Sequence, residues 1–312
     1  MANPNFDALL STTLANYRDQ LTDNVFTARP LTYFLMDKGR IRMLNGGTKI
    51  VEPLIYGTNS TVGSYSGYDS IALTPQDGIT AAEYDWKQYV ASISISGIEE
   101  AKNNGEQEII NLLEAKIMQA EESMREGFNQ MFFGNGTGNS GKNWNGLGNI
   151  VEASGTVGGI DRTPSANSWW RSYENNSAGA LTIAKMATAY NTVSVGNDHP
   201  DMILTTQTLF EKYEALLQPN LRYTDTKTAD AGFQNLLFKA APVVYDVHCD
   251  TGVMYVLNSK YLTLVGHTDK WFSQTPFVQP EDVDARYALI MCYGNLTCRN
   301  AAKQGKLTAQ TA

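Results

Sequence analysis

The chain has few of the residues that usually carry chemistry or cross-link a fold. Its 312 residues include three cysteines and three histidines. Cys249, Cys292 and Cys298 are too few and too scattered for a disulfide framework, so we expect reduced, buried thiols. No stretch approaches the roughly 18 apolar residues of a membrane span, and the N-terminus lacks the basic-then-apolar pattern of a signal peptide. The composition predicts a soluble protein of the cytoplasm, or of something assembled there.

Positive charge is also scarce. Lys and Arg number 24 against 32 Asp and Glu, which gives a formal net charge of −8 at pH 7. A dedicated nucleic-acid binder presents a basic surface, so the acidic balance argues against that class. Charged residues make up only 18% of the chain, which leaves much of the surface to uncharged polar residues and to 16 tyrosines. Such a surface suits contact with other protein.

Candidate metal ligands and nucleophiles do not form recognisable patterns. His248 and Cys249 are adjacent, but neighbours on a strand point to opposite faces. Five residues separate Cys292 from Cys298, which is outside the usual zinc spacing. No Gly-x-Ser-x-Gly nucleophile elbow occurs. We therefore expect no catalytic, cofactor-binding or metal-binding residues.

One glycine-rich motif resembles a phosphate-binding loop. Residues 136–143, Gly-Thr-Gly-Asn-Ser-Gly-Lys-Asn, fit G-x-G-x-x-G and the first seven positions of a P-loop. Both phosphate sites need a strand before the loop and a helix after it. Here a helical pattern precedes the loop, Trp144 follows it, and Asn143 replaces the Ser or Thr that would hold magnesium. A flexible connector is the favoured interpretation, and a nucleotide-binding enzyme is the alternative.

The longest regular pattern covers residues 99–133. Apolar residues recur there at spacings of three and four, which predicts one amphipathic helix of about 30 residues, roughly 45 Å long. The apolar positions are Ile110, Leu113, Ile117, Met124, Phe128 and Met131. The mean globular helix has about 11–12 residues, so this one is a strut. The pairs Glu99-Glu100 and Glu121-Glu122 are interpreted as its solvated face and not as a catalytic dyad.

Residues 46–97 are predicted to form a long two-stranded ribbon. Thr48–Tyr56 would be the first strand and Tyr84–Ser96 the second, with turn-rich residues 59–69 as the tip. Tyr89, Ala91, Ile93 and Ile95 alternate onto one face of the second strand. An isolated hairpin is marginally stable in water. We therefore expect the ribbon to rest on a neighbouring chain.

The remaining segments divide by composition. Residues 1–45 have a short amphipathic pattern over 10–21 and a second short helix at Tyr33–Met36, which indicates an arm. Residues 150–178 are predicted to be an irregular excursion, in which Trp169-Trp170 packs in the fold or at an interface; stacking on a sugar or base is the alternative. Residues 180–275 alternate helical and strand patterns, with Thr206 as a helix cap. Tyr287–Cys298 is a returning strand followed by a short polar tail.

In this order, the elements resemble the HK97-like major capsid proteins of tailed bacteriophages. Phe132-Phe133-Gly134-Asn135-Gly136 followed by Gly146-Leu147 is similar to the helix exit of that family. Residues 237–244, Leu-Phe-Lys-Ala-Ala-Pro-Val-Val, are similar to its Leu-x-Gly-x-Pro-Val stretch, with Ala in place of Gly. Val253–His267 is similar to its penultimate hairpin. Each motif is short, and their order over nearly the whole chain carries the resemblance.

The resemblance implies an α+β fold in five parts. Residues 1–45 would be the N-terminal arm, 46–97 the extended E-loop hairpin, and 98–179 the P-domain with its spine helix and glycine-rich loop. Residues 180–275 would be the α/β A-domain, and 276–312 the returning P-domain strand with the C-terminal tail. The A-domains would meet at the centres of hexamers and pentamers.

The implied function is structural. The chain would be a major capsid protein that assembles with itself, through hexamers and pentamers, into an icosahedral shell around double-stranded DNA. Its partners would include scaffolding, portal and decoration proteins, with weak non-specific DNA contact, no cofactor and no membrane. It would occupy the host cytoplasm during assembly and then the virion capsid. The alternatives are an encapsulin-like compartment shell, a tail or adaptor component, and the nucleotide-binding enzyme considered above.

Overall fold

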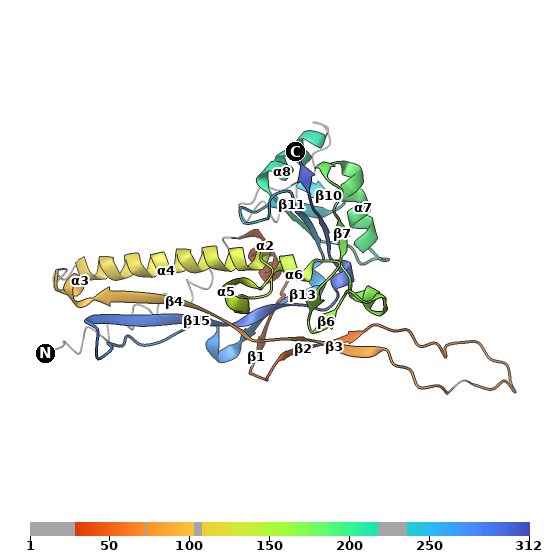
Figure 1. Cartoon of the computed structure of the whole chain (residues 1–312), viewed down its shortest axis with the longest axis horizontal. Helices are drawn as coiled ribbons and strands as arrows, with labels where there is room; N and C mark the ends of the chain where they lie inside the picture. Colours follow the sequence, from red (N-terminus) through yellow and green to blue (C-terminus); the bar gives the residue numbers. More distant parts are fainter. Residues whose placement is uncertain (1–28, 72, 103–107, 218–235) are drawn as a thin grey trace.

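The computed structural model describes residues 29–71, 73–102, 108–217 and 236–312, and for residues 100–102 and 108–114 it describes the backbone alone. Two sheets form the body, and a narrow ribbon projects from it (Figure 1). The long helix α4 (Glu108–Phe133) follows α3 (Gly97–Lys102) and runs beside the first sheet. Its 26 residues correspond to about 39 Å. The predicted strut is therefore present over these residues.

The first sheet has five strands and lies under α4. In sheet order, β1 pairs with β13, β13 with β15, and β15 with both β14 and β4. The strands are β1 (Ile41–Leu44), β4 (Lys87–Ser96), β13 (Leu262–His267), β14 (Ser273–Gln274) and β15 (Ala285–Cys298). Only the pairing of β1 with β13 is parallel. Ile93 and Ile95 of β4 are buried, together with Ile117, Met124 and Phe128 of α4. The alternation in the sequence therefore identified the face of β4 that meets the helix.

The second sheet has six strands and its own core. Its order is β10-β11-β9-β12-β16-β7. The strands are β7 (Tyr173–Asn175), β9 (Met202–Thr205), β10 (Leu236–Phe238), β11 (Ala241–Tyr245), β12 (Met254–Leu257) and β16 (Gly305–Leu307). Helices α7 (Ile183–Val193) and α8 (Gln207–Leu216) pack against it, and Thr182 and Thr206 cap their N-termini through side-chain oxygens. The predicted cap at Thr206 is confirmed.

Short elements connect these bodies. They are α2 (Pro30–Asp37), α5 (Gly138–Gly141), α6 (Leu147–Ile150), the pair β5 (Thr156–Val157) and β6 (Ile160–Asp161), the pair β8 (Gly179–Ala180) and β17 (Gln310–Thr311), and four 3₁₀ segments. The 3₁₀ segments are Ser165–Trp170, Ser259–Tyr261, Thr268–Lys270 and Ala301–Lys303. The ribbon itself consists of β2 (Ile50–Ile55) and β3 (Ile79–Tyr84), which pair antiparallel.

The predicted pairing of the ribbon is wrong in its second strand. The sequence analysis expected Tyr84–Ser96 to pair with Thr48–Tyr56, but β2 pairs with β3, and β4 pairs with β15 over its whole length. The ladder breaks at Asp85 and Trp86. The apolar face of β4 is covered by α4, a partner that alternation alone does not specify. The ribbon expected over residues 46–97 therefore ends near residue 86, and β4 belongs to the body.

Residues 30–45 are part of the body, contrary to the expectation of an arm. Leu31 and Leu35 of α2 are about 1% exposed within the core, and β1 adds a parallel strand to β13. The predicted helix over residues 10–21 lies outside the described residues, as do the side chains of Ile110 and Leu113.

One further assignment of the sequence analysis is wrong, and two are incomplete. The stretch Val253–His267 is no hairpin, because β12 and β13 belong to different sheets. The expected irregular excursion supplies β7, and the polar tail supplies β16, so both complete the second sheet. In contrast, the returning strand is confirmed as β15. Short strands such as β7 and β16 carry too few residues for a period to be read.

Candidate intersubunit surfaces

The ribbon exposes apolar side chains that its own chain does not cover. Inward positions of β2 are buried and outward ones are exposed, with Ile55 at 82%. Beyond the paired strands, the ribbon tip, which we define as residues 57–71 and 73–78, extends into solvent (Figure 1). Its exposed apolar side chains include Leu73, at 91%, and those of Val62, Tyr65, Tyr68 and Ile71. Exposed apolar side chains gathered on one projecting segment are typical of an interaction site.

A buried ionic cluster fixes the base of the ribbon. Glu52 of β2 is fully buried. Its carboxylate accepts hydrogen bonds from Arg299 Nε at 2.8 Å, from Thr297 Oγ1 at 3.3 Å and from Arg42 Nη2. The three partners come from β1, from β15 and from the residue after it. Because a buried carboxylate is stable only with partners in place, this cluster ties the ribbon to the first sheet in one orientation.

Tyr84 provides a second attachment at the end of β3. Its hydroxyl donates to Cys298 O at 2.8 Å and accepts from Cys298 N at 3.1 Å. Burial raises the pKa of Tyr84 well above its usual value, so the hydroxyl keeps its proton. The contact joins the ribbon to the end of β15. The ribbon base is therefore held from both of its strands.

The Trp169-Trp170 pair packs at the ribbon base, as the sequence analysis expected. Trp169 stacks on Tyr56 with ring centroids 5.0 Å apart, and buried Trp170 donates from Nε1 to Val157 O at 3.1 Å. The backbone of Glu83 donates to Gly158 O at 2.9 Å. Residues 156–170 thus brace the ribbon, and the tryptophans are occupied by packing.

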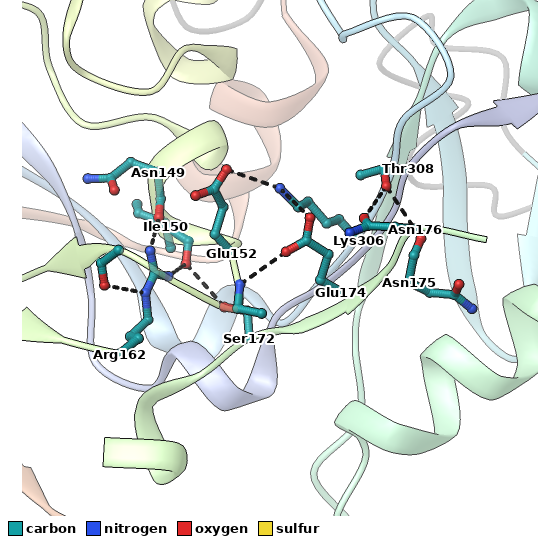
Figure 2. A network of polar contacts seen from close by, with 12 residues as sticks. Asn149, Ile150, Glu152, Arg162, Ser172, Glu174, Asn175, Asn176, Lys306 and Thr308 are labelled. Atoms are coloured by element: carbon teal, nitrogen blue, oxygen red, sulfur yellow. Dashed lines mark hydrogen bonds and ion pairs between the residues drawn. The ribbon is translucent and has the colours of Figure 1, made fainter. Parts of the chain in front are cut away.

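A polar network joins the second sheet to the segment after α6 (Figure 2). Lys306 of β16 lies 3.3 Å from both Glu152 and Glu174. Arg162 donates to Asn149 O at 2.9 Å and to Ile150 O at 3.0 Å, and burial lowers the pKa of its guanidinium. Lys306 and the two glutamates neutralise one another, and Arg162 bonds backbone oxygens. Such an arrangement is typical of a contact that holds two parts of a fold together. The sequence analysis did not identify this network, because its members come from distant segments.

The glycine-rich loop lacks the geometry of a nucleotide site. Helix α4 precedes it, and the helix after it, α6, has only four residues. Asn139 and Ser140 take left-handed backbone angles of φ 52° and 58°, and Lys87 donates to the Gly141 carbonyl. No strand–loop–helix unit therefore directs backbone amides at a phosphate here.

The Gly146-Leu147 step has a packing role. A Cβ on Gly146 would lie 2.2 Å from Gly134 O and 2.4 Å from Met131 O. The backbone after the loop therefore passes directly against the end of α4. Leu147 and Trp144 are fully buried beside this crossing. The motif that resembles the family's helix exit closes the loop onto the helix.

Thiols and histidines occupy structural positions. All three cysteines are free and buried, as expected, and burial raises the pKa of Cys298 to about 12. His248 Nε2 lies 2.8 Å from Glu126 on α4. Within the described ranges, no group of three or more His, Cys, Asp or Glu side chains is placed to hold a metal ion. In those same ranges, no helix has the length and apolar character needed to cross a membrane.

Comparison with known proteins finds similarity in solved structures. No protein-family model matches the sequence, and no curated protein matches it. The chain aligns with one from the cyanophage A-1(L) capsid asymmetric unit over 89% of its length and 93% of that chain, with a TM-score of 0.65 and 18% identity. The holo-SrpI encapsulin complex from Synechococcus elongatus gives 89% and 88% coverage, a TM-score of 0.57 and 10% identity.

A third similar structure is the satellite phage P4 procapsid including the size determination (Sid) protein. It gives 91% and 92% coverage, a TM-score of 0.52 and 11% identity. Phage capsid and encapsulin chains thus match about nine-tenths of the length of this chain. The chain has the α+β HK97-like capsid fold.

Proposed function

We propose that this chain is the major capsid protein of a tailed bacteriophage. It assembles with itself, through hexamers and pentamers, into an icosahedral shell around double-stranded DNA. The observation that carries the proposal is the ribbon, which is anchored at its base by buried Glu52 and exposes apolar residues such as Ile55 and Leu73. A protein that works alone gains nothing from such a surface. A neighbouring copy would bury it.

The shape suits closed assembly. Head-to-tail contacts form a ring when the rotation closes. The ribbon projects from one end of the body, and α4 with β4 and β15 extends toward the other (Figure 1). Copies arranged in a ring can therefore each place a ribbon on the next subunit. The fold shared with cyanophage and P4 capsid chains supports this use of the shape.

We assign the parts of the fold as follows. The E-loop is the ribbon of residues 46–86, the P-domain contains α3, α4 and the five-stranded sheet, and the A-domain contains the six-stranded sheet with α7 and α8. The A-domains would meet at the centres of hexamers and pentamers. Scaffolding, portal and decoration proteins would be further partners, and assembly would take place in the host cytoplasm. The net charge of −8 favours weak, salt-sensitive contact with packaged DNA.

An encapsulin-like compartment shell is the second candidate, because the SrpI encapsulin chain shares the fold at similar coverage. The two candidates differ in what the shell encloses. Encapsulin cargo is protein, whereas a phage shell is filled with DNA.

Electron microscopy of the protein expressed alone tests the proposal. We expect closed, roughly spherical particles, and nuclease treatment followed by extraction would determine whether they protect nucleic acid. Particles that copurify with a stoichiometric protein cargo and no nucleic acid would favour the compartment shell. Open tubes or rings would favour a tail or adaptor component. A stable monomer at high concentration, with no particles under any salt condition, would overturn the proposal.

A further inference from the structure

The second sheet stands at the C-terminal end of α4, and a cleft lies between them over part of this boundary (Figure 1). The cleft has a volume of about 630 Å³. One wall is the end of α4 with Phe133 and Asn135, and the other comes from β12, β16 and the loop after β11. Because no side chain fills this space, the contacts beside it decide how firmly the sheet and the helix are joined.

The loop after β11, residues 246–253, makes two polar contacts with α4. Asn129 donates from Nδ2 to Asp246 Oδ1 at 2.6 Å, and both side chains are buried. His248 Nε2 lies 2.8 Å from Glu126 Oε1. Since positions 126 and 129 are three residues apart, both contacts lie on one face of the helix. The loop is therefore fastened to α4 at two neighbouring points.

The two contacts respond differently to pH. The amide of Asn129 does not titrate, whereas a histidine changes charge between about pH 5 and 8. A neutral imidazole carries one N–H, and in the tautomer with its hydrogen on Nδ1 the lone pair of Nε2 would face the Glu126 carboxylate. Protonation places a hydrogen on Nε2 and a positive charge beside that carboxylate, across 2.8 Å. The contact of His248 with Glu126 therefore becomes an ion pair as the pH falls through this range.

Arg29 holds the Glu126 carboxylate in position. Its Nη2 lies 2.7 Å from Glu126 Oε2, which leaves Oε1 to His248. An arginine stays charged throughout the range in which a histidine titrates. The carboxylate therefore keeps one fixed cationic partner, and the second partner depends on pH.

The remaining titratable groups around His248 come from its own loop and from the walls of the cleft. Asp246 accepts from the backbone N–H of His248 at 2.9 Å, and Lys306 lies 3.3 Å from both Glu152 and Glu174. Burial raises the pKa values of Cys249 and Tyr255, so both stay protonated. The other members that line the cleft with His248 are Glu152, Asp250, Tyr255 and Lys306. Histidine is the type among these whose usual titration range lies between pH 5 and 8, so the pH response is assigned to His248.

We infer that Glu126 and His248 form a pH-sensitive latch between the strut and the second sheet. The latch closes when His248 is protonated and loosens when it loses the proton, while the bond from Asn129 to Asp246 keeps the loop near the helix. The inference goes beyond the proposed function and does not depend on it, because the latch joins two parts of one chain. A change of pH alone would then alter how firmly the second sheet is held on α4.

The thiol of Cys249 provides a reporter for opening of the loop. It is 6% exposed, and its Sγ lies 3.6 Å from Val253 O, so a thiol reagent reaches it only when the loop opens. The rate of labelling by 4,4′-dithiodipyridine is measured on the full chain near pH 5.5 and near pH 8, with mass spectrometry to separate Cys249 from Cys292 and Cys298. Each rate is divided by the rate in denaturant at the same pH, which removes the intrinsic reactivity of the thiol.

Near pH 5.5, His248→Gln should label about two- to fivefold faster than the unaltered chain, as expected for loss of a partly exposed ion pair. Near pH 8 the two rates should agree, because the imidazole is then uncharged. Glu126→Gln should also label faster near pH 5.5, and adding His248→Gln to it should have no further effect. His267→Gln is the matched control, since that ring packs against Trp86, and it should change neither rate.

Two results would overturn the latch. One is a His248→Gln rate that equals the unaltered rate near pH 5.5 or exceeds it by the same factor at both pH values. The other is an additional increase when His248→Gln is combined with Glu126→Gln. Electron microscopy of the same preparations reports assembly separately. Particles can form whether or not the labelling rate depends on pH, so a failed latch leaves the proposed function standing.

Discussion

Replacing Glu52 with Gln should destabilise the subunit and misdirect the ribbon. The carboxylate is fully buried and bonds Arg42, Thr297 and Arg299. The neutral amide loses the charge that both arginines face, and its NH₂ group would oppose an arginine N–H. The substitution changes the side-chain volume little, so the change in stability reports the loss of the charge and not a loss of packing.

The magnitude follows from the burial of the partners. Breaking a fully buried ion pair by removing one member costs about 3–5 kcal/mol. The side chains of Arg42 and Arg299 are 33% and 42% exposed, so each recovers part of its hydration. We therefore expect a loss of about 2–3 kcal/mol in the free energy of unfolding, which lies within the range for one hydrogen bond to a charged group. For a chain of 312 residues that loss corresponds to a fall in melting temperature of about 3–5 °C.

Thermal unfolding of the unassembled subunit measures the loss, and particle counts by electron microscopy measure assembly. Glu83→Gln is the matched control, because Glu83 lies on the other ribbon strand and pairs with Lys49 where both side chains are about half exposed. Its effect should stay within about 0.5 kcal/mol. If Glu52→Gln has the same melting temperature as the unaltered protein and assembles normally, the cluster does not orient the ribbon.

The other predictions concern the strut and the loop. Ile117→Asp should abolish folding, because it buries an unpaired charge under α4; soluble, helical protein by circular dichroism would contradict this. Gly146→Ala should cost about 1–3 kcal/mol in denaturant unfolding, because its Cβ meets backbone oxygens within 2.4 Å, and an unchanged midpoint would refute the close packing. ATP with magnesium should give no heat of binding; micromolar binding lost in Lys142→Ala would restore the nucleotide-enzyme hypothesis. The hydrogen bond from Lys116 lowers the pKa of Glu99 to about 2, so the stability it contributes is present above about pH 4.3 and is lost as the pH falls toward 2; in Glu99→Gln that dependence should disappear from acid unfolding curves.

The sequence predicted elements better than it predicted their partners. The 3.6-residue period located α4, and two-residue alternation located the buried face of β4 and the long strand β15. Thr206 marked a helix start because its side chain satisfies a free N–H. The assignment of β4 to the ribbon failed, because the same apolar face can be covered by a helix or by a second strand.

The anchoring cluster was missed for a different reason. Its members Arg42, Glu52 and Arg299 are far apart in sequence, and no local pattern joins them. One signal was available: Glu52 occupies an inward position in the alternating stretch Ile50–Ile55, where an apolar residue is expected. A charged residue at such a position indicates a buried partner. The partner itself could come only from the three-dimensional structure.

The position of β16 has a consequence for synthesis. This strand lies between β12 and β7, although it is translated after every other strand of that sheet. A nascent chain on the ribosome therefore cannot close the second core until residues 305–307 have emerged. Polypeptides that end before β16 would have an incomplete sheet, with no strand between β12 and β7. Proteases would therefore degrade these incomplete chains more readily than the complete subunit, which limits their incorporation into assemblies.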